Sequence, residues 1–251
     1  MQQEVAGLRA LQITPKYLWF LASSYSMIIV LGNWFDLRLI KLFGVVTNAG
    51  TFIFAFTFFL SNLITEVYGY KYARLSIWGG FLFNVIVILY GQLVIRLPSP
   101  EYHSYNEMFD LLLQANNRAI VAGLISYFSA EPLNTFVMAK LKVEFQGRYV
   151  GARYILATVI AASVDSALFG FIAFYNTMNT RLLISLIFGM MFVKIVVNLL
   201  GVPFFVHFSK RLKNLEKLDI YDKGTKFNLF KLDTFYTLSA NRYVNGQLTR
   251  H

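Results

Sequence analysis

Residues 182–208 read LLISLIFGMMFVKIVVNLLGVPFFVHF, and residues 154–175 read YILATVIAASVDSALFGFIAFY. Each run is long and apolar enough to cross a membrane, because about 20 helical residues span the ~30 Å hydrocarbon layer. Each run also carries one charge near its centre, Lys194 in the first and Asp165 in the second. A charge at the bilayer centre costs about 2.5–3.5 kcal/mol even on lenient insertion scales, so it is normally paired or functional. The two runs therefore predict a polar site buried between membrane helices.

The composition of the whole chain agrees with a membrane protein. Of its 251 residues, 57% are hydrophobic and 14% are charged, whereas a soluble domain carries about a quarter charged residues. The apolar runs predict six spans, at residues 17–31, 49–67, 75–95, 119–139, 154–175 and 182–208. The predicted fold is therefore an all-α, polytopic bundle of six transmembrane helices.

Two segments lie outside these spans. Residues 33–47 are semi-apolar, which is compatible with a segment along the membrane interface or with an extension of the first helix. Residues 212–251 are too polar to span, so the chain is divided into a membrane domain at 1–211 and a polar, basic tail at 212–251. The composition of the tail does not decide whether it is ordered.

The distribution of basic residues predicts the orientation. With the N-terminus inside, the inner segments and the tail hold 17 of the 23 Lys and Arg, the outer segments hold five, and Lys194 is left in the membrane. Both termini are therefore predicted to be cytoplasmic. The net charge of +10 is gathered in the links and the tail, where it faces anionic lipid, so it does not indicate a nucleic-acid-binding protein. The chain has no cysteine, and its three histidines lack ligand spacing, so neither a metal site nor a cofactor is expected.

Asp165 and Lys194 are predicted to lie at the same depth. Lys194 lies roughly 18 Å below the outer end of its helix, and Asp165 lies roughly 17 Å above the inner end of the preceding antiparallel helix. Asn198 follows Lys194 by four residues on the same helical face, and Ser166 adjoins Asp165. An ion pair is feasible, and it can serve either as part of a substrate site or as a structural pair that fixes helix register.

The fourth span carries a further acid. Glu131 and Asn134 lie on either side of Pro132, which removes a backbone donor and is tolerated at membrane depth where a helix lines a cavity. Glu131 can belong to the central site, or it can extend inward toward Lys140 or Lys142.

The second span ends with several polar residues. Asn62, Thr65 and Glu66 approach the predicted cytoplasmic end of this helix. Glu66 can contribute directly to a site, or it can lie at the helix end near Lys71 and Arg74.

The fourth and fifth spans echo one another. Arg118 precedes Glu131 by 13 residues, and Arg153 precedes Asp165 by 12. Because these two helices run in opposite directions, the echo is of the inverted-topology kind that transporters use around a central site.

Four stretches carry a resemblance to a known family. They are SNLITEVYGYKYAR at 61–74, SVDSALFGFIAF at 163–174, FVKIVVN at 192–198 and LDIYDKGTKFN at 218–228. From the second span to residue 228, the chain resembles the queuosine precursor transporters, also called the vitamin uptake transporter family. The resemblance implies a six-helix importer of deazaguanine bases in the bacterial inner membrane. Many members carry Asp at the position of Glu131, so this wall of the pocket is expected to differ.

The implied ligand suits the polar residues. A guanine-type edge presents an N–H beside an amino group, and one carboxylate can accept from both. Asp165 is the first candidate for this role and Glu131 the second, with Lys194 donating to the base carbonyl. The expected substrate-binding residues are Asn62, Glu66, Asn84, Glu131, Asn134, Asp165, Lys194 and Asn198. The expected partners are the small base and the lipid bilayer, with a homo-oligomer left open.

Two other functions compete with a transporter of this kind. A substrate-binding membrane subunit of an energy-coupling vitamin importer would dock on an ATPase module through small residues, for which Ala22-x-x-x-Ser26 is only a loose match. An intramembrane enzyme would need a nucleophile, a metal site or a phosphate motif, and the sequence contains none of these. The chain is therefore predicted to be a transporter and not an enzyme.

Overall fold

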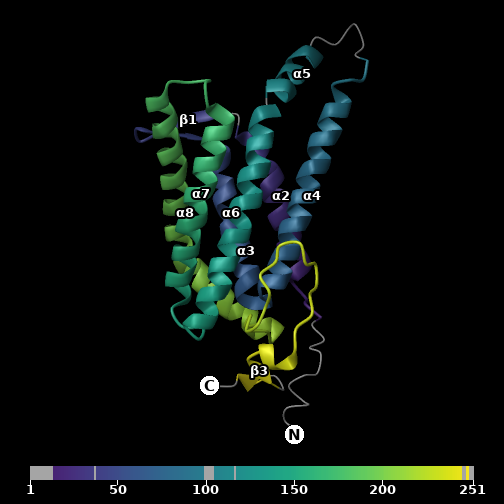
Figure 1. Cartoon of the computed structure of the whole chain (residues 1–251), viewed down its shortest axis with the longest axis vertical. Helices are drawn as coiled ribbons and strands as arrows, with labels where there is room; N and C mark the ends of the chain where they lie inside the picture. Colours follow the sequence, from purple (N-terminus) through teal and green to yellow (C-terminus); the bar gives the residue numbers. More distant parts are fainter. Residues whose placement is uncertain (1–13, 37, 99–104, 116, 245–246, 249–251) are drawn as a thin grey trace.

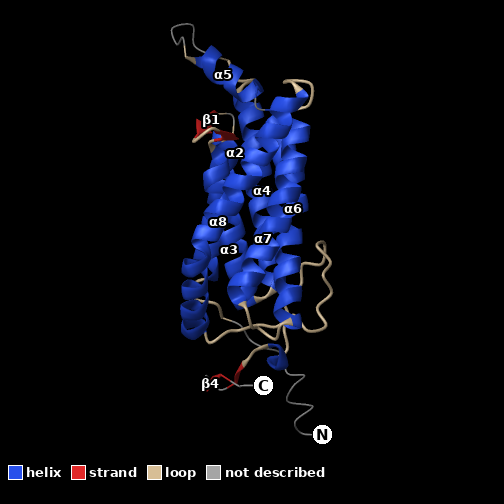
Figure 2. Cartoon of the chain, turned by 90° about the vertical axis from the view of Figure 1, so that its left-hand side faces the viewer, coloured by secondary structure: helices blue, strands red, loops and turns tan. Residues whose placement is uncertain are grey.

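A computed structural model describes residues 14–36, 38–98, 105–115, 117–244 and 247–248. Six of the described helices are long and apolar enough to cross a membrane, which confirms the predicted all-α class. They run up and down side by side in one bundle (Figure 1). Their bounds are α2 Leu18–Phe35, α3 Gly50–Tyr68, α4 Tyr70–Val94, α6 Asn117–Glu144, α7 Val150–Phe174 and α8 Thr180–Glu216. A shorter helix, α5 (Asn106–Ala115), precedes α6 and leans away from the bundle (Figure 2).

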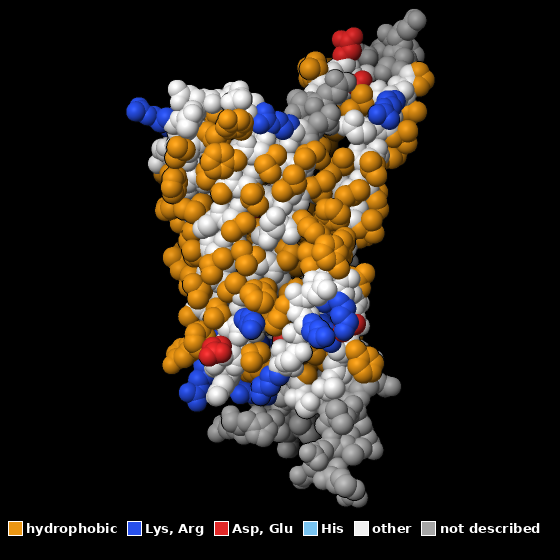
Figure 3. All heavy atoms as spheres, viewed as in Figure 1, with side chains coloured by type: hydrophobic (Ala, Val, Ile, Leu, Met, Phe, Trp, Pro, Cys, Tyr) orange, Lys and Arg blue, Asp and Glu red, His pale blue; other side chains and the backbone are white. Residues whose placement is uncertain are grey.

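The outer surface of the bundle suits a lipid environment. Hydrophobic side chains cover the middle of the face in Figure 3, and Lys and Arg side chains gather near its two ends. This is the pattern of a surface that meets acyl chains between two aqueous layers. The chain is thus a multi-pass membrane protein.

Both described ends of the chain lie at one end of the bundle, which we call the tail end. The backbone amides of Lys16 and Tyr17 donate to the Glu216 carboxylate at 3.1 and 2.8 Å, so the start of α2 lies beside the end of α8. Helix α8 continues to Glu216, past the predicted boundary at residue 211. We call the opposite end of the bundle the hairpin end.

Helix α3 is the central helix. In its most apolar stretch, 72% of the residues are buried, against 17–44% in the corresponding stretches of the other spans. It packs against α2, α4, α6 and α8. Its buried polar residues recur at helical spacing along one stripe, namely Thr57, Ser61, Asn62, Thr65 and Glu66. Lipid cannot satisfy such groups, so this helix must lie where other helices supply partners.

The turn between α3 and α4 requires glycine. Gly69 adopts a φ of +85°, in the left-handed region that side chains avoid, and its amide caps α3 by donating to the Thr65 carbonyl at 3.1 Å. A Cβ here would also lie 2.4 Å from the Tyr236 hydroxyl oxygen. Two constraints therefore require glycine at this position of the motif at 61–74: the positive φ of the backbone and the close packing of Tyr236.

The link between α2 and α3 contains strands that the sequence did not predict. Helix α2 extends to Phe35, beyond the predicted end at residue 31, and is followed by an antiparallel hairpin of β1 (Leu39–Leu42) and β2 (Val45–Asn48). Phe43 and Gly44 form the two-residue turn, both with positive φ. The hairpin lies at the end of the bundle opposite the tail (Figure 2). The β2 backbone packs against α8 so closely that a Cβ on Gly189 would come within 2.0 Å of the Val46 carbonyl oxygen.

The tail folds back across the bundle. Its regular elements are η1 (Leu238–Ala240), β3 (Tyr243–Val244) and β4 (Gln247–Leu248). Arg74 donates to the carbonyl oxygens of Asn228 and Asp233, each at 2.7 Å, and Asp222 accepts from the Tyr70 amide at 2.9 Å. The described part of the tail is thus ordered against α3 and α4.

Two arginines bind backbone carbonyls at opposite ends of the α6–α7 pair. Arg118, at the start of α6, donates to the Ile172 and Tyr175 carbonyls at the end of α7, at 2.6 and 2.7 Å. Arg153, near the start of α7, donates to the Arg148 carbonyl just after α6 at 2.9 Å. Arg118 therefore caps the end of α7, whereas Arg153 binds the loop between α6 and α7.

We expect Gly189→Ala to destabilise the protein by about 1–3 kcal/mol, because the new methyl group must displace the β2 backbone. Gly79→Ala is the matched control, since a Cβ there meets no atom within 4 Å. Thermal unfolding in detergent should show a lower Tm for the first variant alone. Equal Tm values would contradict the close packing of the hairpin on α8.

Candidate functional site

The Asp165 carboxylate and the Lys194 ammonium form an ion pair inside the bundle, as the sequence predicted. The side chains come from α7 and α8, and they are 2% and 5% exposed. The Lys194 ammonium also lies 5.0 Å from the centre of the Phe54 ring, a cation–π distance. The pair is not saturated, because the Oδ1 atom of Asp165 and the hydroxyl of Ser166 are buried without a hydrogen-bond partner.

The ion pair borders a small void toward the hairpin end. Four polar residues that sequence reasoning did not place in the site also line this void: Asn33, Asp36, Asn48 and Ser126. Asp36 is a second buried acid near Lys194. The sequence could have indicated Asn33 and Asp36 by their spacing of three residues. This spacing places both side chains on one helical face when α2 continues to Phe35. The volume that the centre of a water molecule can occupy in this void is only about 10 Å³. The void therefore has room for one water molecule.

Glu131 forms a second polar centre nearby. It is fully buried, and neither carboxylate oxygen has a hydrogen-bond partner. The hydroxyls of Tyr25, Thr57 and Ser61 lie close around it and are its nearest donors. Asp165 lies within electrostatic range. Glu131 is therefore a buried acid whose surroundings are hydroxyl groups, without a cation paired to it among the described ion pairs.

The alternative partners of Glu131 are engaged elsewhere. Lys142 donates to the Ile220 carbonyl at 2.7 Å and pairs with Asp219 at 2.7 Å. Lys140 lies 5.8 Å from the centre of the Phe227 ring. The interpretation in which Glu131 extends toward these lysines is wrong.

An amide cluster joins α3, α6 and α7 beside Glu131. The Asn62 amide donates to the Asn134 carbonyl oxygen at 3.1 Å and to the Thr158 hydroxyl at 3.4 Å, and the Asn134 amide donates to Ser61 at 3.0 Å. The carbonyl oxygen of Asn62 is buried without a partner. The structure thus brings Asn62, Asn134 and Glu131 together.

Asn198 and Asn84 differ from this group. Asn198 lies next to Lys194, but its amide donates to the carbonyls of Lys194 and Ala55 at 2.8 and 3.1 Å, and its oxygen accepts from Tyr154. Its hydrogen-bonding capacity is used within the bundle. Asn84 lines a different cavity, between α2, α4, α5 and α6.

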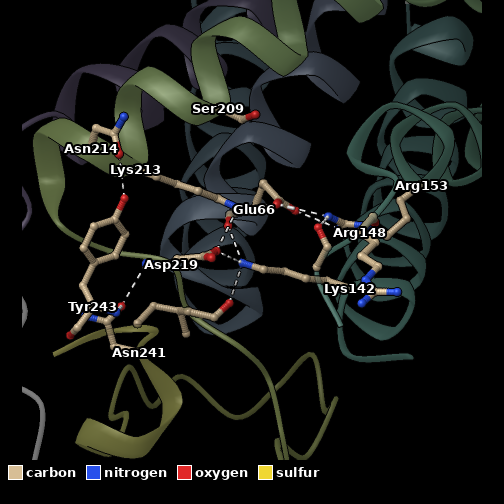
Figure 4. A network of polar contacts seen from close by, with 12 residues as sticks. Glu66, Lys142, Arg148, Arg153, Ser209, Lys213, Asn214, Asp219, Asn241 and Tyr243 are labelled. Atoms are coloured by element: carbon tan, nitrogen blue, oxygen red, sulfur yellow. Dashed lines mark hydrogen bonds and ion pairs between the residues drawn. The ribbon is translucent and has the colours of Figure 1, made fainter. Parts of the chain in front are cut away.

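Glu66 lies at the tail end in a network of charges (Figure 4). It accepts two hydrogen bonds from the Arg153 guanidinium, at 2.8 and 3.2 Å, and pairs with Lys213 at 2.5 Å. The expected neighbours Lys71 and Arg74 pair instead with Asp233. The side chain of Glu66 is thus fully used in closing the tail end.

The tail contributes Asp219 to this network. Its carboxylate lies 2.7 Å from the Lys142 ammonium and 2.8 Å from the Lys213 ammonium. Burial acts to raise the pKa of Asp219, but the two ammonium groups outweigh it and hold the pKa below its usual range. Ion pairs from α3, α6, α7, α8 and the tail therefore seal this end of the bundle.

The arrangement favours reversible binding over bond chemistry. Buried acceptors without partners come from Asp165, Glu131 and Asn62, and an unpartnered hydroxyl comes from Ser166. Among the residues that the structure describes, no group of three or more His, Asp or Glu could hold a metal ion. Unsatisfied polar atoms around a charge pair suit a polar, uncharged ligand that supplies several N–H donors and an acceptor.

Comparisons with known proteins agree with a transport role. The chain matches a family model described as "Putative vitamin uptake transporter" over residues 48–208. It is also similar to a Bacillus subtilis (strain 168) protein named "Probable queuosine precursor transporter", with 21% identity over 185 residues, which cover 72% of this chain and 79% of that protein. No solved structure matches the chain.

Asp219 predicts a pH dependence of tail docking. Because its folded pKa is depressed, Asp219 stabilises the docked tail above its unfolded pKa of about 4, and this contribution is lost as the pH falls through the folded value. The protection of residues 218–243 against hydrogen exchange, taken relative to the intrinsic exchange rate at each pH, should therefore fall below about pH 4. Asp219→Asn should lower this protection already at neutral pH, because two buried ammonium groups lose a partner.

Thr237→Ala serves as the control, since this half-buried residue loses only an exposed hydroxyl contact with Ser239. If Asp219→Asn and wild type exchange at the same rate from neutral to acid pH, the tail is held by other contacts.

Proposed function

Because the chain belongs to the family described as "Putative vitamin uptake transporter", we propose that it imports purine-like deazaguanine bases, the precursors of queuosine. It is a transport protein and not an enzyme. The relative from B. subtilis is named for queuosine precursors, and the polar site of this chain has chemistry that fits such bases.

The observation that carries the proposal is the unsaturated ion pair at the centre of the bundle. A guanine-type edge can donate an N–H and an amino N–H to one carboxylate, as Asp165 or Glu131 could accept. The Lys194 ammonium could then donate to the base carbonyl. Buried polar atoms without partners, among them Asp165 Oδ1 and both oxygens of Glu131, would be satisfied by such a ligand.

The size of the central void indicates a closed state. A bicyclic base cannot enter a space that holds one water. The hairpin packs over the void from one side, and the Glu66 network closes the other. Transport would then require the helices to separate at one end at a time around a fixed central site, as in alternating access.

The charge distribution supports an orientation in the membrane. The tail end carries most of the Lys and Arg residues, so it faces the cytoplasm by the positive-inside rule. Both termini are then cytoplasmic, and the hairpin faces outward. We place the protein in the bacterial inner membrane.

Uptake of a labelled deazaguanine base by cells that lack their own importer tests the proposal. We expect Asp165→Asn and Lys194→Met each to lower uptake by about tenfold or more at equal surface expression, since each leaves a buried partner unpaired. Ser129→Ala is the control, because this hydroxyl is exposed and bonds only within its own helix. Wild type that imports no such base would overturn the substrate assignment.

The double variant Asp165→Asn/Lys194→Met separates a binding role from a structural one. Replacing both members of a buried pair by neutral side chains is often neutral or stabilising. We therefore expect a wild-type Tm without uptake. If the double variant transports normally, the pair serves only the packing of α7 on α8.

Uptake by the purified protein in liposomes tests the energy-coupling alternative. We expect saturable uptake without an added ATPase. Uptake that appears only with a co-purified ATPase would favour the alternative.

A further inference from the structure

Glu131 is buried near the middle of α6 without a neutralising cation. Its side chain is fully buried, and it takes part in none of the described ion pairs. By contrast, Asp165 pairs with Lys194 in the same bundle, and Glu66 pairs with Arg153. An ionised carboxylate is strongly disfavoured in such a place, and a buried acid without a counter-charge normally takes up a proton instead.

The hydroxyl groups nearest to Glu131 donate to other acceptors. Thr57 and Ser61 each donate to the backbone carbonyl three residues earlier on α3, at 2.8 and 3.4 Å. Tyr25 donates to the Tyr127 hydroxyl at 3.0 Å. While these bonds are made, the three oxygens face Glu131 as acceptors, because a hydroxyl group has only one hydrogen. A protonated carboxyl group supplies the donor that such acceptors need.

The charged and titratable groups around Glu131 also favour its neutral form. Those that face it are Tyr25 of α2, Tyr127 of its own helix and Asp165 of α7. Helix α3 presents uncharged hydroxyls, and α4 presents a backbone carbonyl that accepts from Tyr127 at 2.7 Å. The nearby cation of α8, Lys194, is held by Asp165. An ionised Glu131 would therefore be repelled by Asp165 and attracted by no free cation among the described residues.

A polar path leads from Glu131 to the tail end. From Ser61, beside Glu131, the buried polar stripe of α3 continues through Thr65 to Glu66 in the charge network. Opening of that network would give water a polar route to Glu131. On the other side, Asp165 lies within electrostatic range of Glu131 and lines the void toward the hairpin end. Each opening of the bundle would thus expose Glu131 to a different aqueous side.

We propose that Glu131 carries one proton inward with each base, so that the protein is a proton-coupled symporter. A proton from the outer water binds the carboxylate when the hairpin end is open, and the same proton passes to the inner water when the tail end opens. The base binds at Asp165 and Lys194, and the Glu131 carboxylate is left to the proton. This inference rests on the proposed function for the identity of the base.

Accumulation in liposomes gives the first test. With the membrane potential clamped at zero, wild type should accumulate labelled deazaguanine about tenfold when the lumen is one pH unit more alkaline than the medium, which is the limit for one proton per base. A pH dye in the lumen should report proton entry with the base. Glu131→Gln, which resembles the protonated form, should only equilibrate the base and should give no dye signal.

Glu107→Gln is the matched control, because it makes the same acid-to-amide change at an exposed position of α5. It should accumulate the base as wild type does. Accumulation by Glu131→Gln at the wild-type level would overturn the inference. Accumulation by wild type that follows a sodium gradient at equal pH would also overturn it, since sodium would then be the coupling ion.

Base exchange separates coupling from binding. Exchange of labelled for unlabelled deazaguanine across the liposome membrane does not require Glu131 to release its proton. Glu131→Gln should therefore exchange the base at the wild-type rate although it cannot accumulate it. Loss of exchange together with accumulation would place Glu131 in base binding and overturn the coupling role.

Infrared spectroscopy tests the charge of Glu131 without transport. Wild type in detergent at neutral pH should show the C=O band of a protonated carboxyl group, and Glu131→Gln should lack this band. Asp36→Asn, which changes the other buried acid near Lys194, should retain it. Absence of the band in wild type, or its loss in Asp36→Asn alone, would overturn the inference. Wild type that shows the band but imports no base would instead refute the proposed function.

Discussion

The ion pair between Asp165 and Lys194 couples the fold to the site. Neither charge can face lipid, so α7 and α8 must turn these faces toward one another and toward the centre of the bundle. Helix α3 then fills the remaining space with its polar stripe, and Phe54 of this helix lies against the Lys194 ammonium. The same requirement that buries the pair concentrates other polar side chains around it, because each needs a partner inside the bundle.

The two ends of the bundle are closed by different physical means. At the hairpin end, closure depends on shape, with the β2 backbone fitted against Gly189 of α8. At the tail end it depends on charge, with Glu66 and Asp219 between Arg153, Lys142 and Lys213 (Figure 4). A charge network can exchange its partners for water once it is exposed, whereas a packed backbone must move as a unit. The two ends are therefore held together by different interactions, backbone packing at one and ion pairs at the other.

Helices α6 and α7 run in opposite directions, and each carries one arginine and one buried acid. Arg118 and Arg153 bind carbonyl groups at opposite ends of the pair. Their partner acids in the echo, Glu131 and Asp165, both lie buried near the centre. The two acids are not equivalent, since Asp165 has a lysine and Glu131 has none among the described ion pairs. This difference separates a charged half of the site from a hydrogen-bonding half.

The six spans, their apolar faces and the meeting of Asp165 with Lys194 followed from the sequence. Their causes are short-range or follow from the period of a helix, because a run of about 20 apolar residues must span and its buried charge must be paired. The hairpin, the docking of the tail on Arg74, and the assignment of Glu66 to a closing network and of Asn84 to a separate cavity could not be predicted. These depend on which helix faces meet, and one-dimensional spacing does not specify the rotation and depth of each helix relative to its neighbours. Asn33 and Asp36 were missed for the same reason, since their place beside the void appears only once α2 is extended and its end meets side chains of α6 and α7 there.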